Sequence, residues 1–350
     1  MGMRGRCRRI NWPGRWAAFV LCLLVAGCGD SAERRPEPLH ESDLLVFGVA
    51  GDYDEAAYKI VAIRADGRRM RTLARVATNH LIWSPDGRHI AFDELADVFT
   101  AESSLQVMDA DGTHPRQLVP KQDGDSYVAD WSPDSKRVLY SLADPGGEHM
   151  PRGLWTVRID GRGKRRLAMP AGAGAATWSP DGSTIVFVTG DTAEDSSVYL
   201  FDVRTGRSRL LVRNGDSPRW TPDGKRIVFR NAYQGKRSGI YIVDRDGGSP
   251  KLLERLGADE DPSLGDVSPD GNWIIVSYHP ALSRLSLADG ELQKLTSVQN
   301  DLTPEWSPDG KRVAFERNGN IWLMDADGRH EHLIARAPRL AVYVRPDWRP

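Results

Sequence analysis

Apolar and polar positions along this chain alternate in short strands and turns from about Leu44 to the C-terminus, and no 3.6-residue periodicity extends over a repeat. A turn phrase, Trp-Ser-Pro-Asp-Gly or a close variant, recurs at intervals of 39 to 48 residues, and an apolar strand follows it. The copies begin at Trp83, Trp131, Trp178, Trp220, Val267 and Trp306. A repeat of this length, with several short strands and frequent turns, is typical of a β-propeller blade.

The residues of the turn phrase explain why it separates two strands. In Ser84-Pro85-Asp86-Gly87 the proline presets the second position of a type I turn, and the glycine takes the fourth. The preceding tryptophan is a large apolar side chain that neighbouring sheets can bury. We therefore expect one structural tryptophan in most blades, namely Trp83, Trp131, Trp178, Trp220, Trp306 and Trp348.

The ends of the chain decide the number of blades. A second phrase, an apolar strand followed by an Asp-Gly or Thr-Gly hairpin, occurs seven times, but no turn phrase precedes the first hairpin. At the C-terminus, Pro346-Asp347-Trp348 repeats the lead-in of Pro304-Glu305-Trp306. We predict an all-β fold, a seven-bladed β-propeller of four-stranded antiparallel blades, whose first blade is closed by the C-terminal strand. The alternative is a six-bladed ring in which the first hairpin is peripheral.

The repeat resembles that of the TolB-type propellers. The resemblance lies in the alternation of the turn phrase with strands such as Leu105–Gly112 and Ile321–Gly328, and it covers nearly all of the chain from Leu44 onward. It implies a non-enzymatic protein-binding scaffold of the cell envelope. That repeat family also includes sensors and the propeller halves of some peptidases, so the resemblance is more specific for fold than for activity.

The N-terminus predicts export and a lipid anchor. Five arginines precede the apolar stretch Trp16–Val25, which is too short to span a bilayer, and Val25-Ala26-Gly27-Cys28 resembles the bacterial lipoprotein box. We predict a signal peptide at residues 1–27, a flexible tether with acylated Cys28 at residues 28–43, and the propeller at residues 44–350. The alternative is an ordinary signal peptide with Cys28 unmodified. Gly29 favours the outer membrane, facing the periplasm, over the inner membrane.

Composition narrows the chemistry of the mature protein. Of three cysteines only Cys28 follows the signal peptide, which excludes an internal disulfide and a cysteine-based metal site. Without the five signal arginines, 42 basic and 48 acidic residues remain, and the basic residues are spread through all repeats. This distribution argues against a nucleic-acid partner.

Catalytic and metal-binding motifs are not evident. There is no Gly-x-Ser-x-Gly phrase, and Asp109-Ala110-Asp111-Gly112 lacks the further acidic positions of a calcium loop. His330 and His332 lack a third ligand. We therefore expect no catalytic residue, no metal and no cofactor.

One pattern predicts a site. The residue before the repeat tryptophan, or before Val267 in its place, is acidic in four blades: Asp130, Asp266, Glu305 and Asp347. If the innermost strands line the channel, these carboxylates attract a cation or a basic segment of a partner. The alternative is that each caps a turn or pairs with a neighbouring cation such as Arg137 or Arg312. The unequal loops between the second and third strands, such as Asp93–Ser103, are expected on one face of the ring and suit recognition.

These observations predict a lipid-anchored, monomeric scaffold that binds an envelope protein or a peptidoglycan-associated partner. The alternative is a propeller enzyme, or a binder of a small ligand such as a glycan or lactone, that uses the channel. A cluster of His, Asp and Glu at the channel mouth would distinguish the two. The histidines are scattered, and only His80 lies near an innermost strand.

Overall fold

The structure is a computed structural model that describes residues 44–51, 58–78, 80–95, 103–143, 151–170, 172–190, 196–231, 238–257, 260, 262–278, 281–297, 301–337 and 341–350. The predicted signal peptide, the tether and Cys28 lie outside the described residues.

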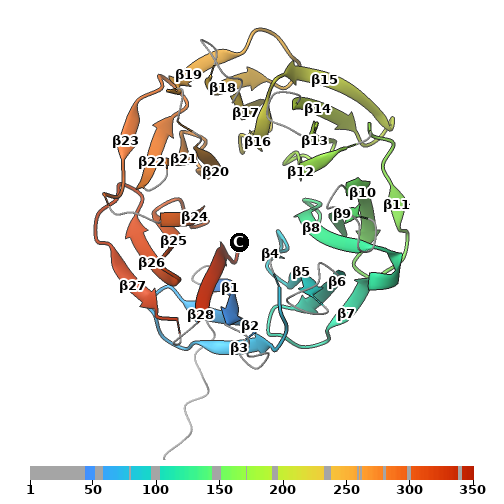
Figure 1. The fold of residues 1–350 in the computed structure, drawn as a ribbon, viewed down its shortest axis with the longest axis vertical. Coiled ribbons are helices and arrows are strands. Elements are labelled where there is room, and N and C mark those ends of the chain that lie inside the picture. The colour runs from blue at the N-terminus through green and yellow to red at the C-terminus, as the bar shows by residue number, and fades with distance from the viewer. Residues whose placement is uncertain are drawn as a thin grey trace, which may run out of the picture. The chain divides into compact units, whose positions relative to one another are not determined.

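The described residues form a ring of seven four-stranded antiparallel sheets (Figure 1). From the channel outward, blade 1 contains β28 (Ala341–Trp348), β1 (Leu44–Gly51), β2 (Lys59–Arg64) and β3 (Arg71–Ala74). Blade 2 contains β4 (Leu81–Trp83), β5 (His89–Leu95), β6 (Ser103–Asp109) and β7 (Arg116–Val119), and blade 3 contains β8 (Asp125–Trp131), β9 (Arg137–Ala143), β10 (Pro151–Arg158) and β11 (Arg165–Arg166). Blade 4 contains β12 (Gly174–Trp178), β13 (Thr184–Thr189), β14 (Ser197–Asp202) and β15 (Arg207–Arg213), and blade 5 contains β16 (Asp216–Trp220), β17 (Arg226–Asn231), β18 (Gly239–Asp244) and β19 (Lys251–Arg255). Blade 6 contains β20 (Ser263–Val267), β21 (Trp273–Tyr278), β22 (Ala281–Ser286) and β23 (Leu292–Lys294), and blade 7 contains β24 (Asp301–Trp306), β25 (Arg312–Arg317), β26 (Asn320–Asp325) and β27 (His332–Ala335). A single 3-10 turn, η3 (Lys121–Asp123), is the one helical element of the described chain.

The C-terminal strand closes the ring, as the sequence predicts. β28 pairs with β1 in antiparallel register, with Leu45 opposite Trp348 and Val46 opposite Asp347. The Arg349 amide then donates to the Leu44 carbonyl at 2.8 Å. In Figure 1 the two ends of the colour scale, red β28 and blue β1, lie side by side near the channel. The seven-bladed prediction is confirmed, and the six-bladed alternative is wrong.

The turn phrase folds as its residue types predict. The Gly87 amide donates to the Ser84 carbonyl at 2.8 Å, and the Ser84 hydroxyl donates to Asp86 Oδ1 at 2.6 Å. Where the phrase departs from its consensus, the geometry is kept: Ser135 takes the glycine position at φ 58°, and the Thr221 hydroxyl replaces serine by donating to Asp223 at 2.6 Å.

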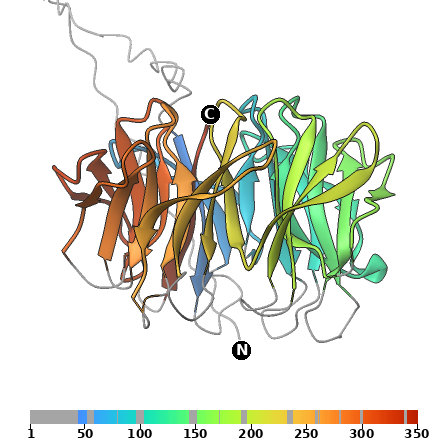
Figure 2. The ribbon, with the colours of Figure 1, turned by 90° about the horizontal axis from the view of Figure 1, so that it is seen from above.

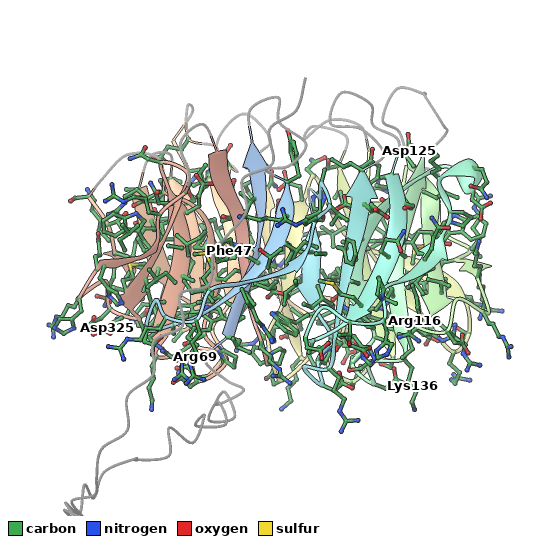
Figure 3. The ribbon with its side chains drawn as sticks, turned by 90° about the horizontal axis from the view of Figure 1, so that it is seen from below. Phe47, Arg69, Arg116, Asp125, Lys136 and Asp325 are labelled. Carbon is green, nitrogen blue, oxygen red and sulfur yellow. The ribbon has the colours of Figure 1, made fainter. Side chains whose placement is uncertain are left out.

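The two faces of the ring differ. Because all strands within a blade are antiparallel, the turn phrases and the Asp-Gly hairpins lie on one face, which we call the turn face. The connections between second and third strands lie on the opposite face, the loop face (Figure 2). Figure 3 shows Asp125 near the loop face and Lys136 near the turn face. Most residues of the longer loops fall outside the described chain, whereas the short connection of blade 7, residues 317–320, is described.

Apolar cores fill the spaces between blades. One cluster joins Val46 and Ile60 of blade 1 to Trp83, Ile90 and Met108 of blade 2, and six further clusters occupy the described part of the ring in the same way. Every repeat tryptophan is at most 9% exposed, so each is part of the apolar packing between blades. The hairpin glycines permit close approach: Gly112 has φ 89°, and a Cβ there would lie 2.6 Å from the Leu73 carbonyl oxygen of blade 1.

Candidate functional site

The residue before the repeat tryptophan occupies an equivalent place on the innermost strand of every blade. We call these seven residues the inner ring. They are Ile82, Asp130, Thr177, Arg219, Asp266, Glu305 and Asp347. The ring therefore holds four carboxylates and one cation.

A cavity of about 450 Å³ lies against five members of the inner ring: Ile82, Arg219, Asp266, Glu305 and Asp347. It extends along the innermost strands from Ser263, at the loop-face end of β20, to Asp266 near the turn face. Leu264, Leu302 and Pro304 form part of its apolar wall. The cavity thus combines apolar sides with a group of carboxylates, and Arg219 is the one cation among its described lining residues.

Asp130 and Asp347 connect neighbouring blades through their carboxylates. Asp347 Oδ2 accepts the Trp83 amide of blade 2 at 2.7 Å. Asp130 Oδ2 accepts the Trp178 amide of blade 4 at 2.7 Å, while its Oδ1 accepts the Trp131 amide of its own blade at 2.7 Å. Each of these aspartates therefore bonds across one blade junction.

At most other junctions the tryptophan itself makes the connection. The indole N–H donates to the inner-ring carbonyl of the preceding blade at 3.1–3.4 Å, in the pairs Trp131–Ile82, Trp220–Thr177, Trp306–Asp266 and Trp348–Glu305. The indole N–H groups of Trp83 and Trp178 have no partner among the described residues. These are the two tryptophans whose backbone amides donate to a carboxylate of the preceding blade. At these six junctions, either a carboxylate accepts the tryptophan backbone amide of the next blade, or the indole N–H donates to a carbonyl of the preceding blade.

The junction between blades 5 and 6, where Val267 replaces tryptophan, uses Arg219. Its guanidinium lies 3.1 Å from Asp266 Oδ1 and donates to the Leu264 carbonyl at 3.0 Å. Arg312, a partner considered from the sequence, places its guanidinium 5.1 Å from the Trp348 ring centroid. The four carboxylates lie on the innermost strands, and three of them, Asp130, Asp266 and Asp347, also bond or pair at blade junctions.

The channel environment shifts two of the carboxyl groups strongly. Burial raises the pKa of Asp130 to about 7, against the lowering effect of the Trp178 and Trp131 amides and of Arg219, while Asp266 adds to the rise. Burial likewise raises the pKa of Asp347 to about 7, and the charges of Asp266 and Asp130 contribute. The carboxylates of blades 1, 3 and 6 therefore interact across the channel.

A second polar group lies near the loop face between blades 2 and 3. Fully buried Asp93 accepts the His80 amide at 2.7 Å and the Thr78 hydroxyl at 2.8 Å, and its Oδ2 lies 3.2 Å from His80 Nδ1. The Tyr127 ring meets the His80 ring edge-on, with centroids 6.5 Å apart. Burial, followed by the charges of Asp125 and Asp93, raises the pKa of Tyr127. The sequence drew attention to His80 but not to Asp93, because their pairing depends on the register of β5.

Metal-binding geometry was not found. No group of three His, Cys, Asp or Glu side chains lies close enough to hold a metal ion in the described residues. His330 Nδ1 lies 2.6 Å from the Asp325 carboxylate. His332 Nδ1 lies 2.8 Å from the His330 carbonyl oxygen. In the part of the chain that the structure describes, no helix is long and apolar enough to cross a membrane.

Fold and site together define a seven-bladed propeller with an acidic cavity along its channel. The sequence profile of the TolB β-propeller domain matches residues 45–285 and 98–350. The chain belongs to the TolB β-propeller domain family. No curated protein sequence matches it significantly.

Solved structures share the fold at low identity. TolB from Acinetobacter baumannii is 21% identical, with a TM-score of 0.57, over 88% of this chain and 83% of that one. An oligogalacturonate lyase in complex with manganese is 16% identical, with a TM-score of 0.61, over 83% and 84% of the two chains. A puromycin hydrolase is 19% identical, with a TM-score of 0.65, over 84% of this chain and 52% of that one. Since TolB, a lyase and a hydrolase all share this architecture, the likeness defines a fold and not an activity.

Proposed function

We propose that this protein is a non-enzymatic scaffold of the bacterial cell envelope that receives a cationic segment of a partner protein in its channel. The observation that carries this proposal is the cavity, in which Asp266, Glu305 and Asp347 lie beside apolar walls. A segment with a basic side chain and apolar neighbours complements such a lining in both charge and polarity. Membership of the TolB propeller family supports a binding role, and the partner is an envelope or peptidoglycan-associated protein.

A photo-crosslinking residue placed at Leu302, within the cavity, tests the binding role in intact cells. We expect a crosslinked envelope protein that a probe at exposed Lys136 on the turn face does not capture. Neutralising the cavity with Glu305→Gln should weaken the crosslink, because long-range attraction of a cation depends on the carboxylates. Equal crosslinking from both probes, or none from Leu302, would contradict the proposal.

The envelope location rests on Cys28 as a lipid anchor, and acyl chains would hold the mature protein on a membrane without a spanning helix. Cys28→Ser should abolish palmitate incorporation and release the protein in soluble form. A variant that still takes up palmitate and stays with the membrane fraction would show that the lipoprotein prediction is wrong.

The second candidate function is an enzyme or small-ligand binder, and the His80–Asp93 pair is the observation that favours it. A buried carboxylate beside Nδ1 orients an imidazole in the manner of a general base, and Nε2 of His80 makes no hydrogen bond to the described residues. Because an oligogalacturonate lyase shares the fold, oligogalacturonate is a reasonable first substrate. Formation of unsaturated uronate products that His80→Gln abolishes would favour this function over the scaffold.

A further inference from the structure

We propose that the channel is a pH-gated site, in which ionisation of Asp130 and Asp347 switches on its attraction for a cationic segment. The gate deepens the proposed function and rests on it for the identity of the occupant. The titration of the two aspartates is a property of the free protein and does not depend on any partner.

The geometry places both groups where their charge matters. Asp347 lines the cavity beside Asp266 and Glu305. Asp130 holds the equivalent position on β8, the innermost strand of blade 3, and its charge interacts with those of Asp266 and Arg219. β4 and β12 contribute Ile82 and Thr177 to the inner ring, which carry no charge. Among the seven inner-ring residues, the other charged groups are therefore Asp266 from β20, Glu305 from β24 and the cation Arg219 from β16.

Because Asp266 is already paired with Arg219, the proposed pH dependence belongs to Asp130 and Asp347. Asp266 already has a counter-charge, since Arg219 lies 3.1 Å away. Among the described residues, the bonded partners of Asp130 and Asp347 are backbone N–H groups, which satisfy lone pairs without cancelling a full charge. Ionisation of both aspartates therefore adds two negative charges to an inner ring whose one cation, Arg219, is already paired with Asp266.

The direction of the effect follows from burial and mutual repulsion. Both raise the pKa values of Asp130 and Asp347 to about 7, so the two groups exchange protons near neutrality and not in the acid range. A cation in the channel binds the ionised form better, and by linkage it also lowers both pKa values. Each added charge about 4 Å from a bound cation strengthens its binding by roughly fivefold at the dielectric constant of bulk water, and salt screens this effect.

The direct test is titration of the free mature protein by carbon-13 NMR of its aspartate carboxyls. We expect two midpoints near neutrality, of which Asp130→Asn removes one and Asp347→Asn the other. Arg219→Gln leaves both carboxylates and their amide donors in place, and it should move the Asp130 midpoint to higher pH. Midpoints below about pH 5 for both aspartates would overturn the gate, whatever the protein binds in the cell.

The binding test uses a fluorescently labelled tetralysine peptide, followed by anisotropy between pH 6 and pH 8 at fixed low salt. We expect affinity to rise at least tenfold over this range in the wild type and to stay nearly constant in Asp130→Asn/Asp347→Asn. The control Asp111→Asn/Asp327→Asn removes two charges from exposed hairpins on the turn face and should keep the full pH dependence. A pH-independent affinity in the wild type would overturn the gate but leave the Leu302 crosslink, and with it the scaffold proposal, intact.

Discussion

At the scale of single residues, the position before the tryptophan takes part in joining two blades, and it does so through different bonds. An aspartate short enough to reach the next backbone amide does so at Asp130 and Asp347, and the following indole N–H is then left without a partner. Where Ile82 or Thr177 stands instead, the next indole turns to the carbonyl of that residue. The sequence shows the acids and the tryptophans, but the choice between the two bonds depends on a residue one blade away.

This difference predicts unequal costs for the same substitution. Trp131→Phe removes an indole bond and leaves the partly buried Ile82 carbonyl with one donor fewer, whereas Trp83→Phe removes an N–H that has no partner among the described residues. Both changes lose similar apolar volume, so Trp131→Phe should lower the free energy of unfolding by about 1 kcal/mol more. Urea unfolding of the two variants measures the difference. Equal losses would show that the indole bond adds nothing to the junction.

A second residue-scale prediction concerns the buried ion pair of blade 7. Arg317, 7% exposed, holds fully buried Asp301 through contacts of 2.5 and 2.9 Å and reaches Glu331 at 2.6 Å. Arg317→Met leaves the Asp301 charge without its partner and should cost about 3–5 kcal/mol. Arg230→Met is the matched control, because the equivalent pair with Asp216 in blade 5 is more exposed, at 15% and 14%, and should cost less. Chemical denaturation tests the order of the two losses.

At the scale of elements, the recurring phrase made strands, turns and blade order predictable. The Ser-Pro-Asp-Gly turn carries its own hydrogen bonds within six residues, so local sequence determines it. For the channel, the acidic residues of the innermost strands were predictable, but their bonding partners were not. That Asp266 pairs with Arg219, and Asp93 with His80, follows from registers and from the closure of the ring, which no local pattern contains.

Turn aspartates and inner-ring aspartates should give stability opposite dependences on pH. Hydrogen bonds from Ser132 and the Lys136 amide hold the pKa of Asp134 below its ordinary value, so its stabilisation is present above about pH 4 and is lost as the pH falls further. The raised pKa values of Asp130 and Asp347 act in reverse, because the folded state then binds protons more tightly than the unfolded chain. Their contribution is largest below about pH 4 and is lost as the pH rises to 7.

The melting temperature should therefore be highest near pH 4–5 and fall toward pH 8, by roughly 2–4 °C for each kcal/mol of stability lost. Histidines titrate in the same range, so the decisive quantity is the slope of melting temperature against pH in wild type and variants. Asp130→Asn/Asp347→Asn should flatten the decline between pH 5 and pH 8, while the acid limb below pH 4 remains. An unchanged slope would contradict the raised pKa values.

At the scale of the whole molecule, the last strand completes both a sheet and a ring. β28 pairs with β1, and it makes two contacts to the neighbouring blades: Trp348 to the Glu305 carbonyl of blade 7 and Asp347 to the Trp83 amide of blade 2. Arg349, which follows the strand, makes a third contact, to the Gly87 carbonyl of blade 2. Trp348, 3% exposed, also packs against Ala314 and Leu323 of blade 7. Closure therefore depends on the final residues of the chain.

Deletion of residues 344–350 should unfold the ring or drive it to aggregate. The deletion exposes the edge of β1, removes all three contacts to the neighbouring blades and unburies the space that Trp348 fills, and the loss of a buried tryptophan alone costs about 3–5 kcal/mol. That is comparable to much of the net stability of a domain. Deletion of residues 29–40 is the control, since these residues precede the first described strand, and it should leave the melting temperature nearly unchanged. Circular dichroism melts and size-exclusion chromatography of the two truncated proteins give the measurement. A C-terminal deletion that melts like the intact protein would mean that six blades hold the ring without their closing strand.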